Sequence, residues 1–270
     1  MQSLAERRTL VVAGLAWSLL APIATAQQSN GGRHLSIGVG PLFISQRDEK
    51  ASPVRYGGAA PFLEVAYTTR TNRRKLDVRV GGAYGIMRSA LTRPNDLPRQ
   101  QTGRGWLDVE YSRMLGAQPS SVRWFLGGLV STHGTVIVHH YDAVSGSEDV
   151  YAFFSAALGP VVRVERGSGA RTMSARLGVP IISLIARPYD VFVPLYREPR
   201  PSGTHLDSRL VTIGSFQAAD FSAAYTVTHR SRTNLVLGYH LVVERYRDVE
   251  AFRFASQTFA LTLAVRLGGG

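Results

Sequence analysis

The chain has 270 residues, a formal net charge of +12 and no cysteine. This length fits one large all-β domain or two small domains, and the lack of cysteine excludes a fold held together by disulfides. The strongly basic composition indicates anionic partners.

The N-terminus has the three parts of a secretory signal peptide. Arg7 and Arg8 precede the apolar run TLVVAGLAWSLLAPI, and the Ala24-Thr25-Ala26 sequence supplies small residues for cleavage. A membrane anchor would need roughly 20 apolar residues, and this run is shorter. We therefore expect residues 1–26 to be a signal peptide and residues 27–270 to form the mature domain. Since the leader has a net charge of +1 from Glu6, Arg7 and Arg8, the mature chain keeps 12 − 1 = +11.

Most of the remaining chain alternates apolar and polar residues, a pattern typical of β-strands. Ten candidate strands follow in chain order, at residues 34–45, 60–70, 75–88, 105–114, 121–139, 150–165, 172–186, 215–229, 234–246 and 252–267. Their connections alternate in length: RTNRRK (70–75) and RGSGAR (166–171) are short, whereas 91–104 and 188–214 are long. No later apolar run approaches the ~18 residues of a transmembrane helix.

Each candidate strand has one face without charges and one face that collects them. Seven acids and five bases fall on the charged face: Glu64, Asp77, Asp108, Glu110, Glu165, Asp220 and Glu244 with Arg79, Arg123, Arg163, Arg176 and Arg266. A charge that faces lipid at mid-membrane costs about 2–4 kcal/mol, whereas a barrel interior can pair or hydrate it. This sorting predicts apolar faces toward lipid and an interior salt-bridge network in which Arg79, Arg123 and Arg176 pair with Asp77, Asp108, Glu110 and Glu244.

Aromatic residues on the uncharged faces predict an interfacial girdle at the short-turn ends of the strands: Tyr67, Tyr111, Trp124 and Tyr225. Phe43 and Tyr84 suit a girdle at the opposite ends. Trp106, Phe252 and Phe254 fall on the charged parity instead, so we expect a register slip or a bulge near them.

The leader, the alternating segments and the girdle positions resemble a small bacterial outer-membrane β-barrel. The resemblance covers the mature chain but includes no motif of any one family. It implies a single antiparallel barrel of about ten strands in the outer membrane of a Gram-negative cell, with short periplasmic turns and long extracellular loops. It also implies barrel-assembly machinery and membrane lipids, including lipopolysaccharide, as partners. A last strand that ends at Leu267, without an aromatic residue, departs from the common pattern.

Residues of three kinds of chemistry occur in the chain. His205-x-Asp207 and the run His139-His140-Tyr141-Asp142 are candidate residues of a surface protease or of a metal site. Ser131, two residues before His133, is a candidate nucleophile of an esterase. The opposed carboxylates of the proteases have no counterpart, and the Ser-His order is the reverse of that in outer-membrane phospholipases. We assign no catalytic residue, metal site or cofactor.

The basic residues of the connections suit anionic headgroups. Five at the short turns, Arg73, Arg74, Lys75, Arg230 and Arg232, are the candidate lipid contacts, although plain solvation explains them equally well. Arginines of the long connections could bind lipopolysaccharide phosphates: Arg93, Arg99, Arg104, Arg197 and Arg200.

The sequence predicts a monomeric, non-enzymatic outer-membrane barrel that does not bind nucleic acid. Its expected role is surface contact, lipid binding or envelope structure. The alternatives are a narrow, porin-like pore or transport component and, less favoured, a hydrolase at the rim. A ten-stranded interior should be narrow and largely filled.

Overall fold

A computed structural model describes residues 32–48, 55–89, 99–116, 122–140, 148–168, 170–188, 206–230, 232–247 and 251–267. The expected signal peptide lies outside these residues. The strands are β1 (Gly32–Asp48), β2 (Tyr56–Arg70), β3 (Arg74–Ser89), β4 (Arg99–Leu115), β5 (Val122–His140), β6 (Glu148–Ser168), β7 (Arg171–Gly178), β8 (Ile182–Pro188), β9 (Leu206–Thr212), β10 (Phe216–Arg230), β11 (Thr233–Tyr246) and β12 (Phe252–Leu267). Within this part of the chain, no helix is long and apolar enough to cross a membrane.

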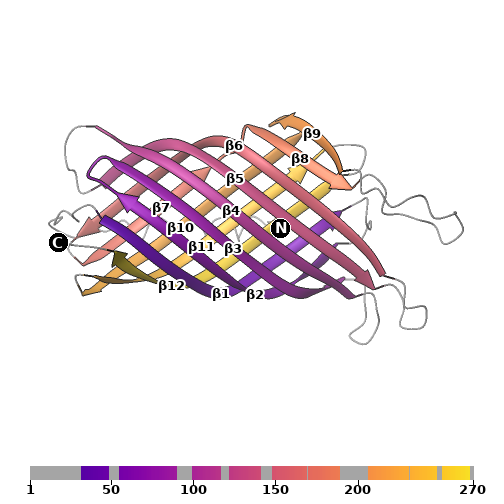
Figure 1. Ribbon diagram of the computed structural model, residues 1–270, viewed down its shortest axis with the longest axis horizontal. Coiled ribbons are helices and arrows are strands. Elements are labelled where there is room, and N and C mark those ends of the chain that lie inside the picture. Colours follow the sequence, from indigo (N-terminus) through magenta and orange to yellow (C-terminus); the bar gives the residue numbers. More distant parts are fainter. Residues whose placement is uncertain are drawn as a thin grey trace, which may run out of the picture.

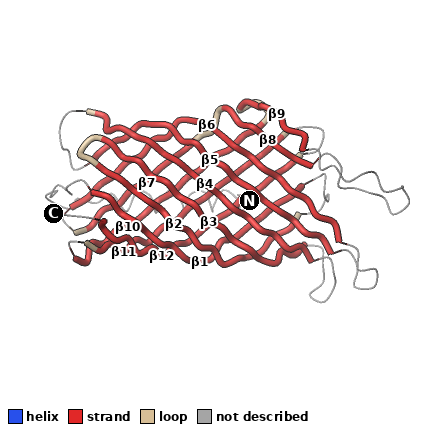
Figure 2. Tube along the Cα trace, in the orientation of Figure 1, coloured by secondary structure: helices blue, strands red, loops and turns tan. Residues whose placement is uncertain are grey.

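The strands close into a barrel. Each of β1 to β6 pairs antiparallel with the next, β7 pairs with both β6 and β10, and β10, β11 and β12 lead back to β1. Figures 1 and 2 show the tilted strands wrapping around one long axis. The predicted antiparallel ten-stranded barrel is thus confirmed, with its first and last strands side by side.

Two neighbouring strands of the barrel are each interrupted. One consists of β7 and β8, which both pair with β6 and are separated by a break at 179–181. The other consists of β9 and β10, which are separated by a break at 213–215. Gly178 lies opposite Asp220, but Ile182 lies opposite Thr212, so the register shifts at the breaks. Pro180 lies in the first break, where its missing N–H removes a ladder hydrogen bond. The sequence placed 188–214 in a connection, which is wrong for 206–212.

The two ends of the barrel differ in their connections. Short ones join β2 to β3, β4 to β5, β6 to β7 and β10 to β11, and β1 begins and β12 ends at this short-turn end. The opposite, long-loop end carries the connections from Asp48 to Tyr56, Ser89 to Arg99, His140 to Glu148 and Pro188 to Leu206. In Figure 1 the long-loop end is on the right.

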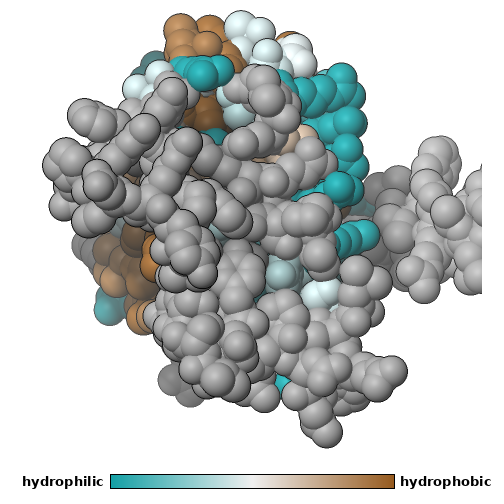
Figure 3. Space-filling model, turned by 90° about the vertical axis from the view of Figure 1, so that its right-hand side faces the viewer, coloured by the Kyte–Doolittle hydropathy of each residue, from teal (hydrophilic) through white to brown (hydrophobic). Residues whose placement is uncertain are grey.

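The outer wall is apolar. Leu63, Leu237 and Phe259 are about half exposed, at 54%, 55% and 51%, and similar residues cover the wall on every side. A water-soluble monomer rarely exposes so large an apolar surface, whereas acyl chains would cover it in a membrane. Figure 3 views the long-loop end, where described hydrophilic residues gather on one side of the rim and hydrophobic ones on the other.

The predicted girdle residues lie on this outer wall near the short-turn end. Tyr111 and Trp124 are exposed, and Tyr67 and Tyr225 are partly exposed. At the other end, Phe43 meets Phe259 edge to face.

The long-loop half of the lumen is filled mainly by an apolar plug, beside which Gln46, Gln100 and Arg187 are also buried. The plug consists of Leu42, Ile44, Tyr56, Ala60, Phe62, Met87, Phe153, Ile185, Phe216, Tyr246, Phe252 and Phe254. The rings of Phe153 on β6 and Phe252 on β12 stack across the lumen, with centroids 4.0 Å apart. The expected slip or bulge at Phe252 and Phe254 is wrong, because β12 pairs with β11 in one continuous register and both rings point inward to be buried.

Candidate functional site

Below the plug, the lumen holds a network of ion pairs centred on Glu110. Arg163 donates to Glu110 at 2.8 Å and to Asp77 at 2.6 Å, and Arg176 donates to the second carboxylate oxygen of Glu110. Arg176 also pairs with Asp220 at 2.7 Å. These five side chains come from β3, β4, β6, β7 and β10, so the network connects strands that are distant around the wall.

Arg79 on β3 extends the network to a second acid of β4. Its guanidinium donates to Asp108 at 3.1 Å and lies 3.8 Å from Asp220, whose other oxygen contacts the ring of His240. Asp108 and Asp220 are nearly fully buried, at 1% and 4% exposure, and buried carboxylates are tolerated when cations neutralise them.

A second cluster lies directly beneath the plug. The Arg104 guanidinium donates to both Glu244 oxygens, at 3.2 and 3.3 Å, and stacks 3.7 Å from the centroid of the Phe254 ring. His133 contacts Glu244 through Nδ1 and approaches Asp108 through Nε2 at 3.5 Å. The sequence placed Arg104 in a long connection, which is wrong, since β4 begins at Arg99 and the side chain is 5% exposed inside the lumen.

Cations surround a single carboxylate at the short-turn mouth. Glu165 accepts a hydrogen bond from Arg70 at 2.7 Å, while Lys75 and Arg123 approach it only to 3.6 Å. Lys75 also lies 3.3 Å from Asp77. The mouth therefore carries more positive than negative charge.

The predicted network residues lie on the lumen side, but several have partners other than those expected. Arg123 pairs with Glu165, Glu244 pairs with Arg104 and His133, and Glu64 accepts from the indole N–H of Trp106 at 3.0 Å. Sequence reasoning assigned Lys75 and Arg104 to lipid contacts and His133 to an esterase that it then rejected, and it gave Arg70 and His240 no place in the lumen. The alternation of side chains places all five in the lumen, because each lies an even number of residues from an inward residue on its strand.

The candidate lipid contacts of the short turns do not all lie on the same face of the barrel wall. Arg73, Arg74 and Arg232 are exposed, whereas Lys75 faces the lumen, and the side chain of Arg230 lies outside the described residues.

The residues considered for catalysis do not form a nucleophile-base pair where the structure describes them. Ser131 and His133 both face the lumen, but no hydrogen bond joins them in the described part, and acids occupy both nitrogens of the His133 ring. The side chains of His139, His140, Asp142, His205 and Asp207 lie outside the described residues, as do those of Arg93, Arg99, Arg197 and Arg200.

A cavity of about 570 Å³ lies beside the ion pairs and reaches the strand ends at the short-turn mouth. Phe62 and Trp106 line its deep end, and His34, Arg70, Lys75 and Arg266 line it near the mouth. The wall of the cavity that β2, β3 and β6 form carries the ionic side chains. The opposite wall presents mainly hydroxyl groups, from Ser36, Ser222, Thr226, Thr228, Thr258 and Thr262.

Arginines form a row on the outer wall at the long-loop end. Arg253 on β12 lies directly opposite Arg47 on β1 and Arg245 on β11. Like charges opposite each other on neighbouring strands repel, because their Cβ atoms are only about 5 Å apart. In the described part of the chain, neither Arg245 nor Arg253 forms an ion pair with an acid. Arg245 and Arg253 thus place positive charge on the rim that no acid of the described residues neutralises, and Arg47 adds its own charge beside them.

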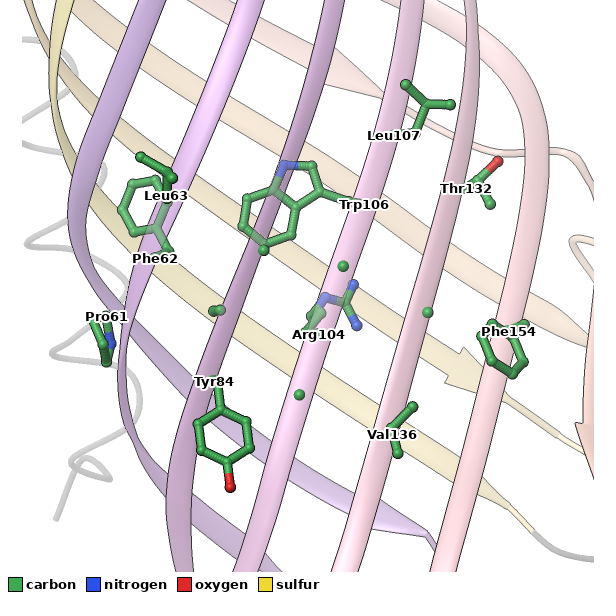
Figure 4. A pocket seen from close by; sticks show the side chains of 15 residues that line it. Pro61, Phe62, Leu63, Tyr84, Arg104, Trp106, Leu107, Thr132, Val136 and Phe154 are labelled. Carbon is green, nitrogen blue, oxygen red and sulfur yellow. The ribbon is translucent and has the colours of Figure 1, made fainter.

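The outer wall also has a shallow depression across β2 to β6. Gly82, Gly105 and Gly134 lie opposite one another on β3, β4 and β5 and form its floor. Figure 4 shows the side chains of Leu63, Tyr84 and Phe154 around it. The depression lies within the apolar wall.

The chain matches no protein-family model, and no characterised protein matches it by sequence. Its fold is similar to that of the outer-membrane protease OmpT from Escherichia coli, with a TM-score of 0.54 and 9% identity over 90% of this chain and 99% of the other. The translocator domain of the autotransporter NalP from Neisseria meningitidis covers 97% of this chain, and 96% of its own length, with a TM-score of 0.46 and 8% identity. The barrel thus has the fold of the bacterial outer-membrane β-barrels. At these identities, the similarity extends to the fold alone.

Proposed function

We propose that this protein is a non-enzymatic outer-membrane barrel that binds phosphorylated lipid headgroups on its outer wall. The observation that carries the proposal is the row of Arg47, Arg253 and Arg245. In such barrels, long loops face the exterior and short turns face the periplasm, which assigns this row to the outer leaflet. Lipopolysaccharide in that leaflet bears phosphate groups, and arginine binds phosphate through paired N–H donors.

The position of the row suits a headgroup. Phe43, Val243 and Phe259 belong to the apolar wall on the same three strands, and the row lies beyond them toward the loops. A lipid whose acyl chains cover those residues would place its phosphate near the guanidinium groups. Bound phosphate would also relieve the repulsion between the opposed arginines, so lipid binding and wall stability support each other.

The test replaces Arg245 and Arg253 by Gln and measures lipid A binding to the detergent-purified barrel by native mass spectrometry. A surface arginine contributes about 1 kcal/mol to binding an anionic membrane, so the double variant should bind roughly 30-fold more weakly. The control, Arg113→Gln with Arg166→Gln, removes the same charge from the short-turn rim and should retain the affinity. Equal losses of lipid A affinity in both variants would mean that binding depends only on the net charge of the protein, which would contradict the proposal.

A narrow pore is the second candidate, and the cavity at the short-turn mouth favours it. The apolar plug argues against it, because stacked rings leave an ion no polar groups to replace its hydration shell. We therefore infer that the resting barrel is closed.

A further inference from the structure

We propose that the cavity at the short-turn mouth is a binding site for a small solute that bears a phosphate and hydroxyl groups. The site lies inside the barrel and is separate from the lipid-facing arginine row. Three features of the described residues point to this ligand chemistry: two concern the cations of the mouth, and the third concerns the opposite wall of the cavity.

The first feature is the excess of cations at the mouth. Arg70, Lys75 and Arg123 share the Glu165 carboxylate, and the charges of Arg266, Arg70 and Lys75 all act on His34 across the opening. Low-dielectric walls on all sides focus this positive potential into the lumen. An anion that enters from the short-turn end is therefore attracted inward.

The second feature is the hydrogen-bonding capacity that remains on these cations. Arg70 lies within normal hydrogen-bond distance of Glu165, but Lys75 is 3.3 Å or more from its acids and Arg123 is 3.6 Å away. Among the described residues, the side chains of Lys75 and Arg123 make ion pairs but no hydrogen bond. The Lys75 ammonium lines the cavity and is available to phosphate oxygens, which accept several charge-assisted hydrogen bonds at once, while Arg123 adds positive charge beside Glu165 at the edge of the cavity.

The third feature is the wall opposite the ion pairs. Hydroxyl groups of Ser222, Thr226 and Thr262 line it, and no acid lines the cavity on β10, β11, β12 or β1 within the described residues. Hydroxyl groups both donate and accept hydrogen bonds, so they can bind the hydroxyls of a polyol without repelling its phosphate. The cavity volume of about 570 Å³ is in the range of small-molecule sites.

Phosphate with neighbouring hydroxyls can come from a free solute or from a lipid headgroup that reaches over the rim. Calorimetric titration of glycerol 3-phosphate into the folded barrel in a neutral detergent tests the free solute. Nanodiscs of phosphatidylglycerol, compared with nanodiscs of phosphatidylcholine, test the headgroup, because an occupied site would weaken binding of added glycerol 3-phosphate.

The test variant is Lys75→Gln with Arg123→Gln, which should weaken glycerol 3-phosphate binding by roughly tenfold or more. The control, Arg74→Gln with Arg113→Gln, removes two charges from the outer face of the same end and should retain wild-type affinity. Thr262→Val provides a third variant that keeps every charge and should bind less tightly. A heat-dependent gel shift establishes that each variant is folded before titration.

Binding of glycerol 3-phosphate that is lost only in the mouth and Thr262 variants supports a free solute. Competition from phosphatidylglycerol alone, with the same variant pattern, supports the headgroup. The proposal is overturned if glycerol binds as well as its phosphate, if the outer-face variant is equally impaired, or if neither phosphate source binds. A failure here leaves the arginine-row proposal intact, because that proposal is tested with lipid A and different residues.

Discussion

At the residue scale, Glu110 joins two buried arginines of the lumen. Its two oxygens accept from Arg163 and Arg176, and its side chain is 2% exposed. A buried ion pair contributes little net stability compared with apolar residues of the same shape, but removing one partner leaves the other as an uncompensated charge. Glu110 has two such partners, so the barrel should be sensitive to its neutralisation.

We expect Glu110→Gln to lower the free energy of unfolding by about 3 kcal/mol, measured by urea titration of the barrel in lipid vesicles. Glu64→Gln is the matched control, because the amide oxygen of Gln can still accept the Trp106 hydrogen bond. Its cost should be near 1 kcal/mol. Equal effects of the two changes would contradict the central place of Glu110.

At the element scale, two neighbouring strands approach too closely for a side chain at Gly127. A Cβ there would lie 1.9 Å from the Tyr111 carbonyl oxygen and 2.6 Å from the Ser112 Cα. Both are backbone atoms of β4, so no rotamer change relieves the clash. At Gly105, on the floor of the outer depression, the nearest atom would be 3.9 Å away.

Gly127→Ala should therefore cost more than about 2 kcal/mol, or prevent assembly, while Gly105→Ala should stay within about 1 kcal/mol of wild type. The fraction of folded barrel on an unheated gel and the urea midpoint measure both. A Gly127→Ala barrel as stable as Gly105→Ala would mean that β4 and β5 lie further apart than described.

At the scale of the whole molecule, the lumen is divided into two compartments. The long-loop half is mainly apolar and aromatic, and the short-turn half is ionic with an open cavity. We therefore expect water and ions to reach the ion pairs from the short-turn mouth, where the cavity meets the strand ends.

We expect the wild-type barrel to be silent in planar lipid bilayers. Replacing Phe153 and Phe252 by Ser removes the rings that stack across the lumen and adds hydroxyls that hydrate the constriction, so the double variant should conduct in discrete steps. Phe259→Ser, on the outer wall, controls for loss of an aromatic residue. Stable steps from the wild-type protein would support the pore instead.

The sequence by itself determined the antiparallel barrel, most of the alternation of connections and the inward face of the twelve charges assigned to it, although Arg104 and Lys75 were assigned elsewhere. These are local properties, because side chains alternate across a strand and lipid enforces the sorting. Asp77, Asp108 and Glu110 could be assigned to the lumen from two-residue periodicity alone.

Only the tertiary structure decided which inward residues meet. Arg104 and Glu244 are 140 positions apart, and Phe153 stacks on Phe252 from across the lumen. Such contacts depend on strand tilt, register and closure, which two-residue alternation does not contain. The same reason applies to the row of Arg47, Arg253 and Arg245. The sequence gives these three residues no common role, and they lie side by side only because the last strand pairs with the first.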